Sequence, residues 1–431
     1  MRWGWPALVW LLSRAAVIAV WLVWEPLASG DVHYYWTRMS ALLAGDAGVG
    51  ETMPEYPTPV LWLLLLPSAF SGSTADGFQT AFLVMMVALD LLFTVMLWWR
   101  GRGRAAVWFW IVFVLALGPI VYFRLDLVPA AAVGLALLAL ARGADGWAGT
   151  LLALGAGLKL WPGTLFPTTV RGSRRRDHRV TVSFAATGVV LVVAAILYGG
   201  WARLLSPLQW QEGRGLQIES VWATVAMIQR ALDPAKYVVR YSRFQAYEIF
   251  GPSTQTWLSI SSAVTVGGYL LIVVGYLAWF RANYPAVFSR RPRLVDAAEP
   301  APAAAVGLFM VAVIMITLVT NKTFSPQYLT WLGAALAALV AVSPPTGSLR
   351  RTVIAAAVVT IPIAVLTQVI YPLGYGSLLR VTADTAAMTT VLAVRNIAVL
   401  LLGLWLVGRF AQVLAQRAGQ HRELGSASAD L

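Results

Sequence analysis

An aspartate shortly after the first apolar segment stands where a carboxylate can act as a general base. Asp31 follows the apolar stretch 6–24, and His33, Tyr34 and Tyr35 come next. Aromatic neighbours shield a carboxylate from water, which raises its pKa toward the range in which it accepts protons efficiently. We expect Asp31 to take the proton from a hydroxyl group, and we expect His33 and Tyr34 to contact the molecule that carries this hydroxyl.

A second acidic turn lies further along the same polar loop. Glu55 and Tyr56 precede Pro57, which restricts the backbone. The turn is either a rigid junction between loop and helix or a second contact for the hydroxyl-bearing molecule. We assign Glu55 and Tyr56 to acceptor binding, together with His33 and Tyr34.

Cationic side chains that suit a phosphate occur in or beside apolar segments. Arg124 and Asp126 share one short turn, where they form either a local ion pair that caps two helices or a contact for a phosphate or a hydroxyl. Lys159 lies inside an apolar stretch, just before Trp161 and Pro162. A lysine in such a place usually faces a cavity or a partner, and its compact charge fits a phosphate, although a long side chain can also reach the membrane surface.

A long polar loop at 202–255 carries a further candidate group. Arg214 stands between two glycines, and Gln217 and Glu219 follow it. We expect this segment to cover the site, with Arg214 on a phosphate and with Gln217 and Glu219 on hydroxyl groups. The alternative is a surface helix with its N-terminal turn, because an amphipathic stretch follows at 221–232.

Five more charged or polar residues need an explanation. Lys322 and Gln327 lie between two apolar segments, where they offer a charge and hydrogen-bond donors at the mouth of the same site. Arg14, Asp90 and Arg395 lie inside apolar segments. We expect these three to pair structurally, because charges at membrane depth need partners.

The composition determines what kind of scaffold can hold these residues. The chain has 431 residues, of which 59% are hydrophobic and only 12% charged, and its mean hydropathy is +0.72. Runs such as 180–198 have about the 20 apolar residues that a bilayer core demands of a helix. The sequence therefore predicts an all-α polytopic membrane protein. Helix-length segments exclude an outer-membrane barrel, whose strands alternate over about ten residues.

Residue usage excludes several kinds of chemistry. The chain has no cysteine, which rules out disulfides, thiol catalysis and cysteine-bound metals. His33, His178 and His421 are scattered, and no pair of neighbouring acids suggests a metal site. We expect neither a metal nor a cofactor.

The formal net charge of +13 points to a membrane orientation rather than to nucleic acid. Basic runs fall in short connections between apolar segments, at 100–104, 171–179, 281–293 and 350–351. Positive charge in such connections is typical of the cytoplasmic side. The acid-rich loops then lie outside the cell, and the chemistry is expected there.

These constraints predict about twelve transmembrane helices with both termini in the cytoplasm. Residues 32–44 are expected to lie as an interfacial helix, and 57–70 as a re-entrant or interfacial helix. A broken hairpin is expected at 147–169, with Lys159 at its tip, since proline disfavours helix at the residue before it. The remaining predicted spans are 6–24, 76–99, 105–123, 127–142, 180–201, 256–280, 301–320, 328–343, 352–370 and 387–408.

The chain reads as one transmembrane domain over 1–408, followed by a polar cytoplasmic tail at 409–431. Its extracytoplasmic loops are expected at about 25–75 and 202–255. No repeat of solenoid period and no second soluble domain is visible in the sequence.

Six short motifs, in this order, resemble a known family. They are Asp31 with the tyrosines after it, Tyr56-Pro57-Thr58-Pro59, Arg124-Leu125-Asp126, Lys159-Leu160-Trp161-Pro162, Arg214 to Ser220, and Ser325-Pro326-Gln327-Tyr328. The set is similar to the actinobacterial polyprenol-phosphate-mannose-dependent α-1,2-mannosyltransferases, which are GT-C glycosyltransferases of the glycosyltransferase 87 class. Relatives often show consecutive prolines after the tyrosine, and the departure at Thr58 bears on the choice of acceptor.

The resemblance implies a multi-pass enzyme of the plasma membrane with an extracytoplasmic active site. The donor would be polyprenyl-phosphate-mannose, the acceptor a lipid or glycan hydroxyl, and the reaction an inverting transfer with Asp31 as the general base. Donor phosphate and sugar would be bound by residues drawn from Arg124, Asp126, Lys159, Arg214, Gln217, Glu219, Lys322 and Gln327. The partners are the donor, the acceptor and membrane lipids.

Three alternatives remain. The donor sugar can be another one, such as arabinofuranose. A transporter or flippase for lipid-linked sugars is also possible, although transporters often show inverted repeats and this chain shows none. A structural or regulatory membrane subunit would leave Lys159 and Asp31 unexplained.

Overall fold

Apolar segments form the helices of the computed structural model, which describes residues 4–100, 104–288 and 300–427. Within these ranges seven helices are long and apolar enough to cross a membrane. They are α1 (Gly4–Val23), α4 (Ala75–Arg100), α9 (Arg174–Glu212), α11 (Thr254–Asn283), α13 (Ala303–Thr320), α15 (Ser348–Gln368) and α17 (Thr385–Ala427). The predicted all-α polytopic membrane class is confirmed.

Shorter apolar helices complete the bundle. They are α3 (Pro59–Ala69), α5 (Ala105–Leu117), α6 (Leu127–Ala141), α7 (Asp145–Leu158) and α14 (Leu329–Val342). All residues of α14 are buried, so this helix lies wholly inside protein. Backbone at membrane depth that is buried in this way need not form one long helix.

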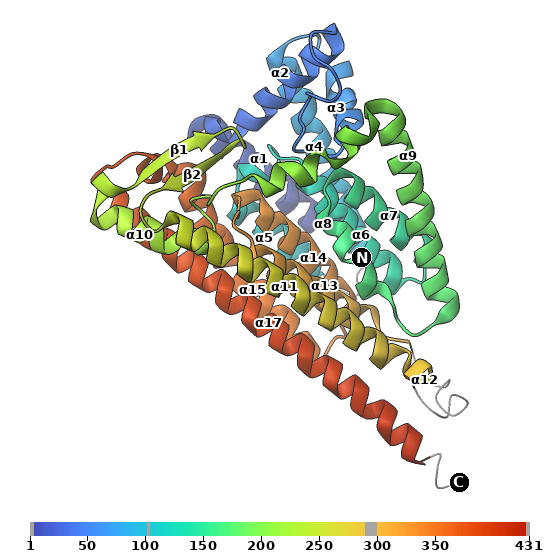
Figure 1. The fold of residues 1–431 in the computed structure, drawn as a ribbon. Helices are drawn as coiled ribbons and strands as arrows, with labels where there is room; N and C mark the ends of the chain where they lie inside the picture. The colour runs from blue at the N-terminus through green and yellow to red at the C-terminus, as the bar shows by residue number, and fades with distance from the viewer. Residues whose placement is uncertain (1–3, 101–103, 289–299, 428–431) are drawn as a thin grey trace.

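The bundle has two chemically different ends. At one end the Arg171 guanidinium donates to the carbonyl oxygens of Leu140 and Ala301; we call it the Arg171 end. At the opposite end Arg124 lies 2.8 Å from a carboxylate oxygen of Asp31, and we call it the Asp31 end. Figure 1 shows α2, α3 and the two strands at one side of the molecule and α12 with the C-terminus at the other.

The expected count of about twelve crossings stays a prediction. In the described part of the chain, the segments that run between the two ends are α1, α4, α5, α6, α7, residues 159–171, α9, α11, α13, α14, α15 and α17, and seven of them are helices long and apolar enough to cross a membrane. The long helices α11, α13 and α17 pack side by side (Figure 1).

The predicted hairpin at 147–169 is broken where expected. Helix α7 ends at Leu158, and Lys159 has extended backbone angles (φ −156°, ψ 129°). The returning arm differs from the prediction, because it holds only the one-turn α8 (Trp161–Thr164) and the 3₁₀ turn η3 (Phe166–Thr169). Prolines at the start of both short turns explain why no longer helix forms.

Two predicted boundaries are corrected. The span expected at 105–123 ends as a helix at Leu117, because Gly118 takes a positive φ of 77° and Pro119 follows it. The last helix, expected to end at 408, continues to Ala427 as α17. Arg102, the basic run at 290–293 and residues 428–431 lie outside the described residues.

The loop predicted at 202–255 contains a β-hairpin that sequence reasoning did not find. Strand β1 (Val238–Ser242) pairs antiparallel with β2 (Ala246–Phe250). The segment 216–218 bonds the free side of β2, since Ile218 N donates to the Tyr247 carbonyl and Ile249 N to the Leu216 carbonyl. The predicted amphipathic stretch is helical, as η4 (Val221–Ala223) and α10 (Thr224–Leu232).

The charges within the apolar helices are paired as expected. The Asp90 carboxylate accepts hydrogen bonds from Arg14 Nε at 2.8 Å, Trp110 Nε1 at 2.6 Å and the Tyr122 hydroxyl at 2.8 Å. A buried ion pair whose remaining lone pairs are filled in this way avoids most of its desolvation penalty. The network joins α1, α4 and α5 and holds the turn that leads to Arg124.

Candidate active site

Helix α2 (Gly30–Ala44) places Asp31 in its first turn, where the helix dipole favours a negative charge. The Asp31 side chain is 41% exposed, and its Oδ2 lies 2.8 Å from Nε of Arg124, whose side chain is 8% exposed. The other donors of Arg124 bond the carbonyls of Ala28 and Phe123 and the Tyr371 hydroxyl. Arg124 is thus held through both Nη atoms by protein groups and forms an ion pair with Asp31.

The surroundings of Asp31 act on its pKa in opposite directions. Burial raises the pKa of the carboxyl group, while the positive charge of Arg124 lowers it. Asp126 adds to the rise, and Lys159 opposes it. The net effect is a raised pKa, which strengthens Asp31 as a proton acceptor.

Tyrosines connect α2 to the turn at 55–56. The Tyr34 hydroxyl donates to Glu55 Oε1 at 2.9 Å, and the hydroxyls of Tyr35 and Tyr56 lie 3.1 Å apart. Burial raises the pKa of Glu55, although Tyr34 donates to it. These residues form one wall of the site, next to Asp31.

Arg203 holds this wall from behind. Its guanidinium donates to the carbonyls of Val49, Thr52, Met53 and Tyr56, and its side chain is 1% exposed. One arginine of α9 therefore fixes the backbone of the whole loop before α3.

Lys159 reaches the site from the tip of the broken hairpin. Its Nζ lies 2.6 Å from Asp126 Oδ1 and 4.6 Å and 5.1 Å from the ring centres of Tyr328 and Trp331. Trp331 Nε1 donates to the same Asp126 oxygen at 2.6 Å, and its indole stacks on that of Trp161. The ammonium group is held in place by a carboxylate and two aromatic faces.

These groups line one small polar cavity of about 80 Å³. Its walls are Asp31, Tyr34, Tyr35, Glu55, Tyr56, Lys159, Gln211, Arg214, Phe244, Gln245, Ser325, Gln327 and Tyr328. A carboxylate and two cations that lie far apart in the sequence therefore meet around one space.

A larger cleft of about 580 Å³ adjoins the cavity and shares Glu55, Lys159, Gln211 and Tyr328 with it. Lys322 lies at its polar end, where Nζ donates to the Glu212 carbonyl. The remaining walls come from α8, α9, α11 and α13 and include Leu160, Trp161, Pro207, Leu208, Tyr269 and Thr317. The cleft thus combines two lysines and two glutamates with polar and apolar side chains.

The segment 213–220 lies beside the cavity, but only part of it faces inward. Arg214 lines the cavity and donates to the Phe244 carbonyl at 3.0 Å. Gln217 instead accepts from Phe324 N at 2.6 Å, and Glu219 is fully buried 3.5 Å from Arg395. Both side chains support the segment from behind.

The structure thus divides the sequence-predicted residues into two groups. Asp31, Tyr34, Glu55, Tyr56, Lys159, Arg214 and Gln327 line the cavity, and Lys322 lines the adjoining cleft. The residues that line neither space are Arg124, Asp126, Gln217, Glu219 and His33. The first four support residues that do, whereas the His33 ring packs against Trp36 on an exposed face of α2.

Sequence reasoning missed several wall residues. Phe244 and Gln245 come from the β-hairpin turn, where Gln245 has a φ of +56°, and no strand was expected there. Gln211 stands near the end of α9, beyond the predicted span. Arg203 carried no signal in the sequence, because its role depends on carbonyl groups about 150 residues away.

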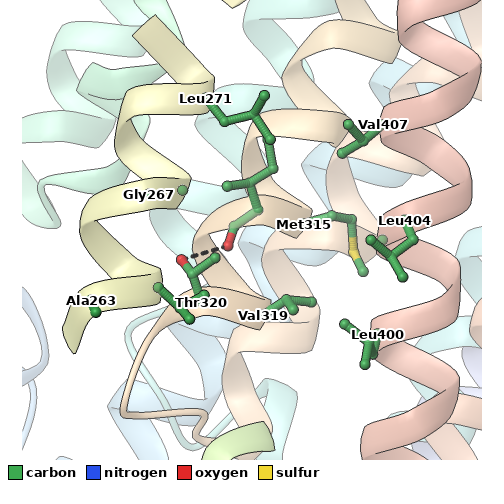
Figure 2. A pocket seen from close by; sticks show the side chains of 13 residues that line it. Ala263, Gly267, Leu271, Met315, Val319, Thr320, Leu400, Leu404 and Val407 are labelled. Atoms are coloured by element: carbon green, nitrogen blue, oxygen red, sulfur yellow. Dashed lines mark hydrogen bonds between the residues drawn. The ribbon is translucent and has the colours of Figure 1, made fainter. Parts of the chain in front are cut away.

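A more apolar groove of about 510 Å³ lies away from these charges, between α11, α13 and α17. Figure 2 shows Gly267 and Leu271 on one side of it, Met315 and Val319 on another, and Leu404 on the third. No ionisable side chain lines it. Since acid–base chemistry needs such groups, the smaller polar cavity is the better candidate for an active site.

The comparisons with known proteins identify a family. Residues 55–291 match the model of glycosyltransferase family 87, a range that includes most of the cavity walls and starts after Asp31. No curated protein and no solved structure matches the chain.

Proposed function

This chain belongs to glycosyltransferase family 87, and on that premise we propose that it transfers mannose from polyprenyl-phosphate-mannose to a hydroxyl group of a lipid or glycan. The reaction takes place on the extracytoplasmic face of the plasma membrane and inverts the anomeric carbon. Asp31 is the general base. The observation that carries this proposal is the single cavity shared by Asp31, Lys159 and Arg214.

The chemical step is a single displacement. The acceptor hydroxyl gives its proton to Asp31 as its oxygen bonds to the anomeric carbon. The bond from that carbon to the phosphate oxygen breaks, and polyprenyl phosphate leaves with the electron pair. No covalent enzyme intermediate is needed, because Asp31 acts on the acceptor hydroxyl while Lys159 and Arg214 of the same cavity act on the phosphate.

Lys159 and Arg214 stabilise the leaving phosphate. Charge builds up on its oxygens in the transition state, and prearranged cations lower the barrier most at that point. Lys159 is held by Asp126 and two aromatic rings, so little reorganisation accompanies the reaction. Arg214 offers several N–H donors at once.

The adjoining cleft supports a lipid-linked donor. Lys159 and Lys322 mark its polar end, while Leu208 and Tyr269 are 56% and 44% exposed at its rim. Leu208 belongs to α9 and Tyr269 to α11, and both helices would face lipid in a membrane. A polyprenyl chain can therefore enter between α9 and α11 while its phosphate reaches Lys159.

We assign Arg124 to the orientation of Asp31 rather than to the expected contact with the donor. Its contacts with Asp31, two carbonyls and Tyr371 make it the residue that orients the base. The acceptor approaches the exposed side of Asp31, and Tyr34, Glu55 and Tyr56 contact its hydroxyl groups.

The test is a transfer assay with purified protein, labelled polyprenyl-phosphate-mannose and a panel of lipid and glycan acceptors. Asp31→Asn should lower the rate by about 10²–10⁴-fold, the usual contribution of a general base, while an unchanged elution profile shows that the fold is retained. Some loss of thermal stability is expected, because the variant removes the carboxylate beside the buried Arg124. The matched control is Asp46→Asn, which changes an exposed aspartate after the end of α2.

Each outcome separates the alternatives. Full activity of Asp31→Asn rejects Asp31 as the base. Transfer from polyprenyl-phosphate-arabinofuranose but not from the mannose donor shows that the donor sugar is arabinofuranose. Movement of intact donor across proteoliposomes without transfer identifies a flippase.

A further inference from the structure

A second apolar groove lies at the Arg171 end, far from the candidate active site. It has a volume of about 310 Å³ and runs between α4, α6 and α7. Its walls are Leu92, Met96, Leu135, Leu138, Ala139, Arg142, Ala144, Trp147 and Leu151. All of these side chains except that of Arg142 are apolar, so the groove is a hydrophobic channel with one cation at its end.

Arg142 is held at this place by the ends of two helices. It is the C-cap residue of α6, and its Nη2 donates to the carbonyl oxygen of Trp99 at 3.2 Å. Trp99 belongs to the last turn of α4, whose carbonyl groups have no partner within the helix. A cation at two helix C-termini is favoured by their dipoles, so the guanidinium group has a defined position at the groove.

Two exposed tryptophans lie on the helices that form the groove. Trp147 lines the groove and is 68% exposed, and Trp99, in the last turn of α4, is 62% exposed. Such rings are typical of the boundary between headgroups and hydrocarbon. The groove therefore begins at headgroup level and extends toward the bilayer interior.

Arg142 is the one ionisable residue among the described walls of the groove. Asp145, the nearest carboxylate in the sequence, is 2% exposed and lies 3.9 Å from Arg171, so its charge is directed to the inside of the protein. An occupant that complements this surface has an apolar chain and a negatively charged head.

We propose that this groove binds one anionic phospholipid of the surrounding bilayer. An acyl chain lies against Leu92, Leu135 and Leu151, and the phosphate contacts Arg142. Basic pockets between membrane helices favour anionic headgroups in this way. The site is independent of sugar transfer, because it lies at the opposite end of the bundle from Asp31.

The experiment uses the full chain, purified in a mild detergent and observed by native mass spectrometry. Phosphatidylglycerol and phosphatidylcholine with identical acyl chains are titrated in parallel, and inorganic phosphate is a third arm. We expect one tightly retained phosphatidylglycerol, with phosphatidylcholine bound at least about fivefold more weakly. One basic residue near an anionic headgroup contributes an effect of about this size.

Three variants locate the site. Arg142→Gln should remove the preference for phosphatidylglycerol, and Leu135→Trp, which fills the groove, should weaken the binding of both lipids. Arg351→Gln is the matched control, because it removes an exposed arginine at the same end but on α15. Thermal unfolding of each variant reports whether the fold is retained.

Several results would overturn the proposal. Equal retention of the two lipids shows that no anionic headgroup is selected. If Arg142→Gln and Arg351→Gln lose the preference for phosphatidylglycerol equally, general surface charge explains the binding. If inorganic phosphate binds as tightly as the lipid, the apolar groove has no part in it. A Leu135→Trp variant that folds and binds phosphatidylglycerol as wild type does also contradicts the site.

Discussion

Glu219 and Arg395 lie 176 positions apart in the chain, yet their side chains face each other at 3.5 Å with no solvent exposure. Arg395 also donates to the backbone carbonyl of Glu219 at 3.1 Å, and Asn396 donates to that of Ser220. Helix α17 thereby anchors the segment that carries Arg214. The anchor lies under the cavity wall and not in it.

This pair should couple stability to the position of Arg214. Removal of one partner of a buried ion pair leaves an uncompensated charge and costs about 3–5 kcal/mol. Arg395→Met should lower the unfolding temperature strongly, whereas Glu219→Gln should lower it less, because Gln resembles the protonated carboxyl group that the fold favours; the double variant should lose less than the sum of the two single variants. Thermal unfolding in detergent gives the double-mutant cycle. Strictly additive losses would show that the two side chains do not interact.

Glu219 should also make stability depend on pH. Burial raises the pKa of its carboxyl group to about 7, and Arg395 opposes this only in part. The folded chain therefore keeps a proton that the unfolded chain has released above its ordinary pKa of 4.5. The contribution of this proton to the free energy of unfolding is complete below pH 4.5, declines as the pH rises to about 7, and is then lost.

Comparison of unfolding temperatures from pH 4.5 to 8 tests this direction. The wild type should lose more stability over this range than Glu219→Gln, which cannot titrate. Glu55→Gln is a useful control, because burial raises the pKa of Glu55 as well. It shows how much of the pH dependence comes from a buried glutamate that is not paired with Arg395. A pH profile identical in wild type and Glu219→Gln is the contrary result.

Lys159 should act on the donor rather than on the acceptor. Because Asp126 is 1% exposed, Lys159→Met is combined with Asp126→Asn to avoid a buried unpaired charge. The double variant should lower kcat/KM for the donor by about 10–100-fold, as expected for a lost hydrogen bond to a charged group. The acceptor KM should stay constant. Lys236→Met with Asp233→Asn removes an exposed ion pair as the control; an unchanged kcat and an unchanged donor KM in the first variant reject the phosphate contact.

We expect Arg203 to hold the acceptor-binding residues Glu55 and Tyr56 in position without contacting the acceptor itself. Arg203→Met removes hydrogen bonds to four carbonyls of the 49–56 loop and frees the backbone of Tyr56. We expect a higher acceptor KM, an unchanged donor KM and a lower unfolding temperature. Steady-state kinetics with each substrate varied in turn measures the split. Equal effects on both substrates would indicate general unfolding of the site.

The orientation in the membrane can be tested directly, because the chain has no cysteine. Single cysteines replace the exposed Arg243 in the β-hairpin turn and the exposed Arg351 at the Arg171 end. An impermeant maleimide added to intact cells should label position 243 and spare position 351 until the cells are opened. The reverse pattern would place the candidate active site in the cytoplasm.

Hydrophobicity and proline positions were sufficient to predict most of the helices. The break before Trp161 follows from local backbone chemistry, and so do the separation of α3 from α4 and the amphipathic α10. The β-hairpin was missed because β1 and β2 have only five residues each, and their pairing partner at 216–218 is not a strand in its own right.

Local sequence also determined which residues are able to do chemistry, since Asp31, Lys159 and Arg214 each stand out by type against apolar or glycine-rich surroundings. Only the tertiary structure decided that these three share a cavity and that Arg124, Gln217 and Glu219 stand behind it. The physical reason is that a side chain's direction depends on partners far away in the chain. Arg395 holds Glu219 away from the cavity, and Asp31 holds Arg124, and no local pattern encodes either contact.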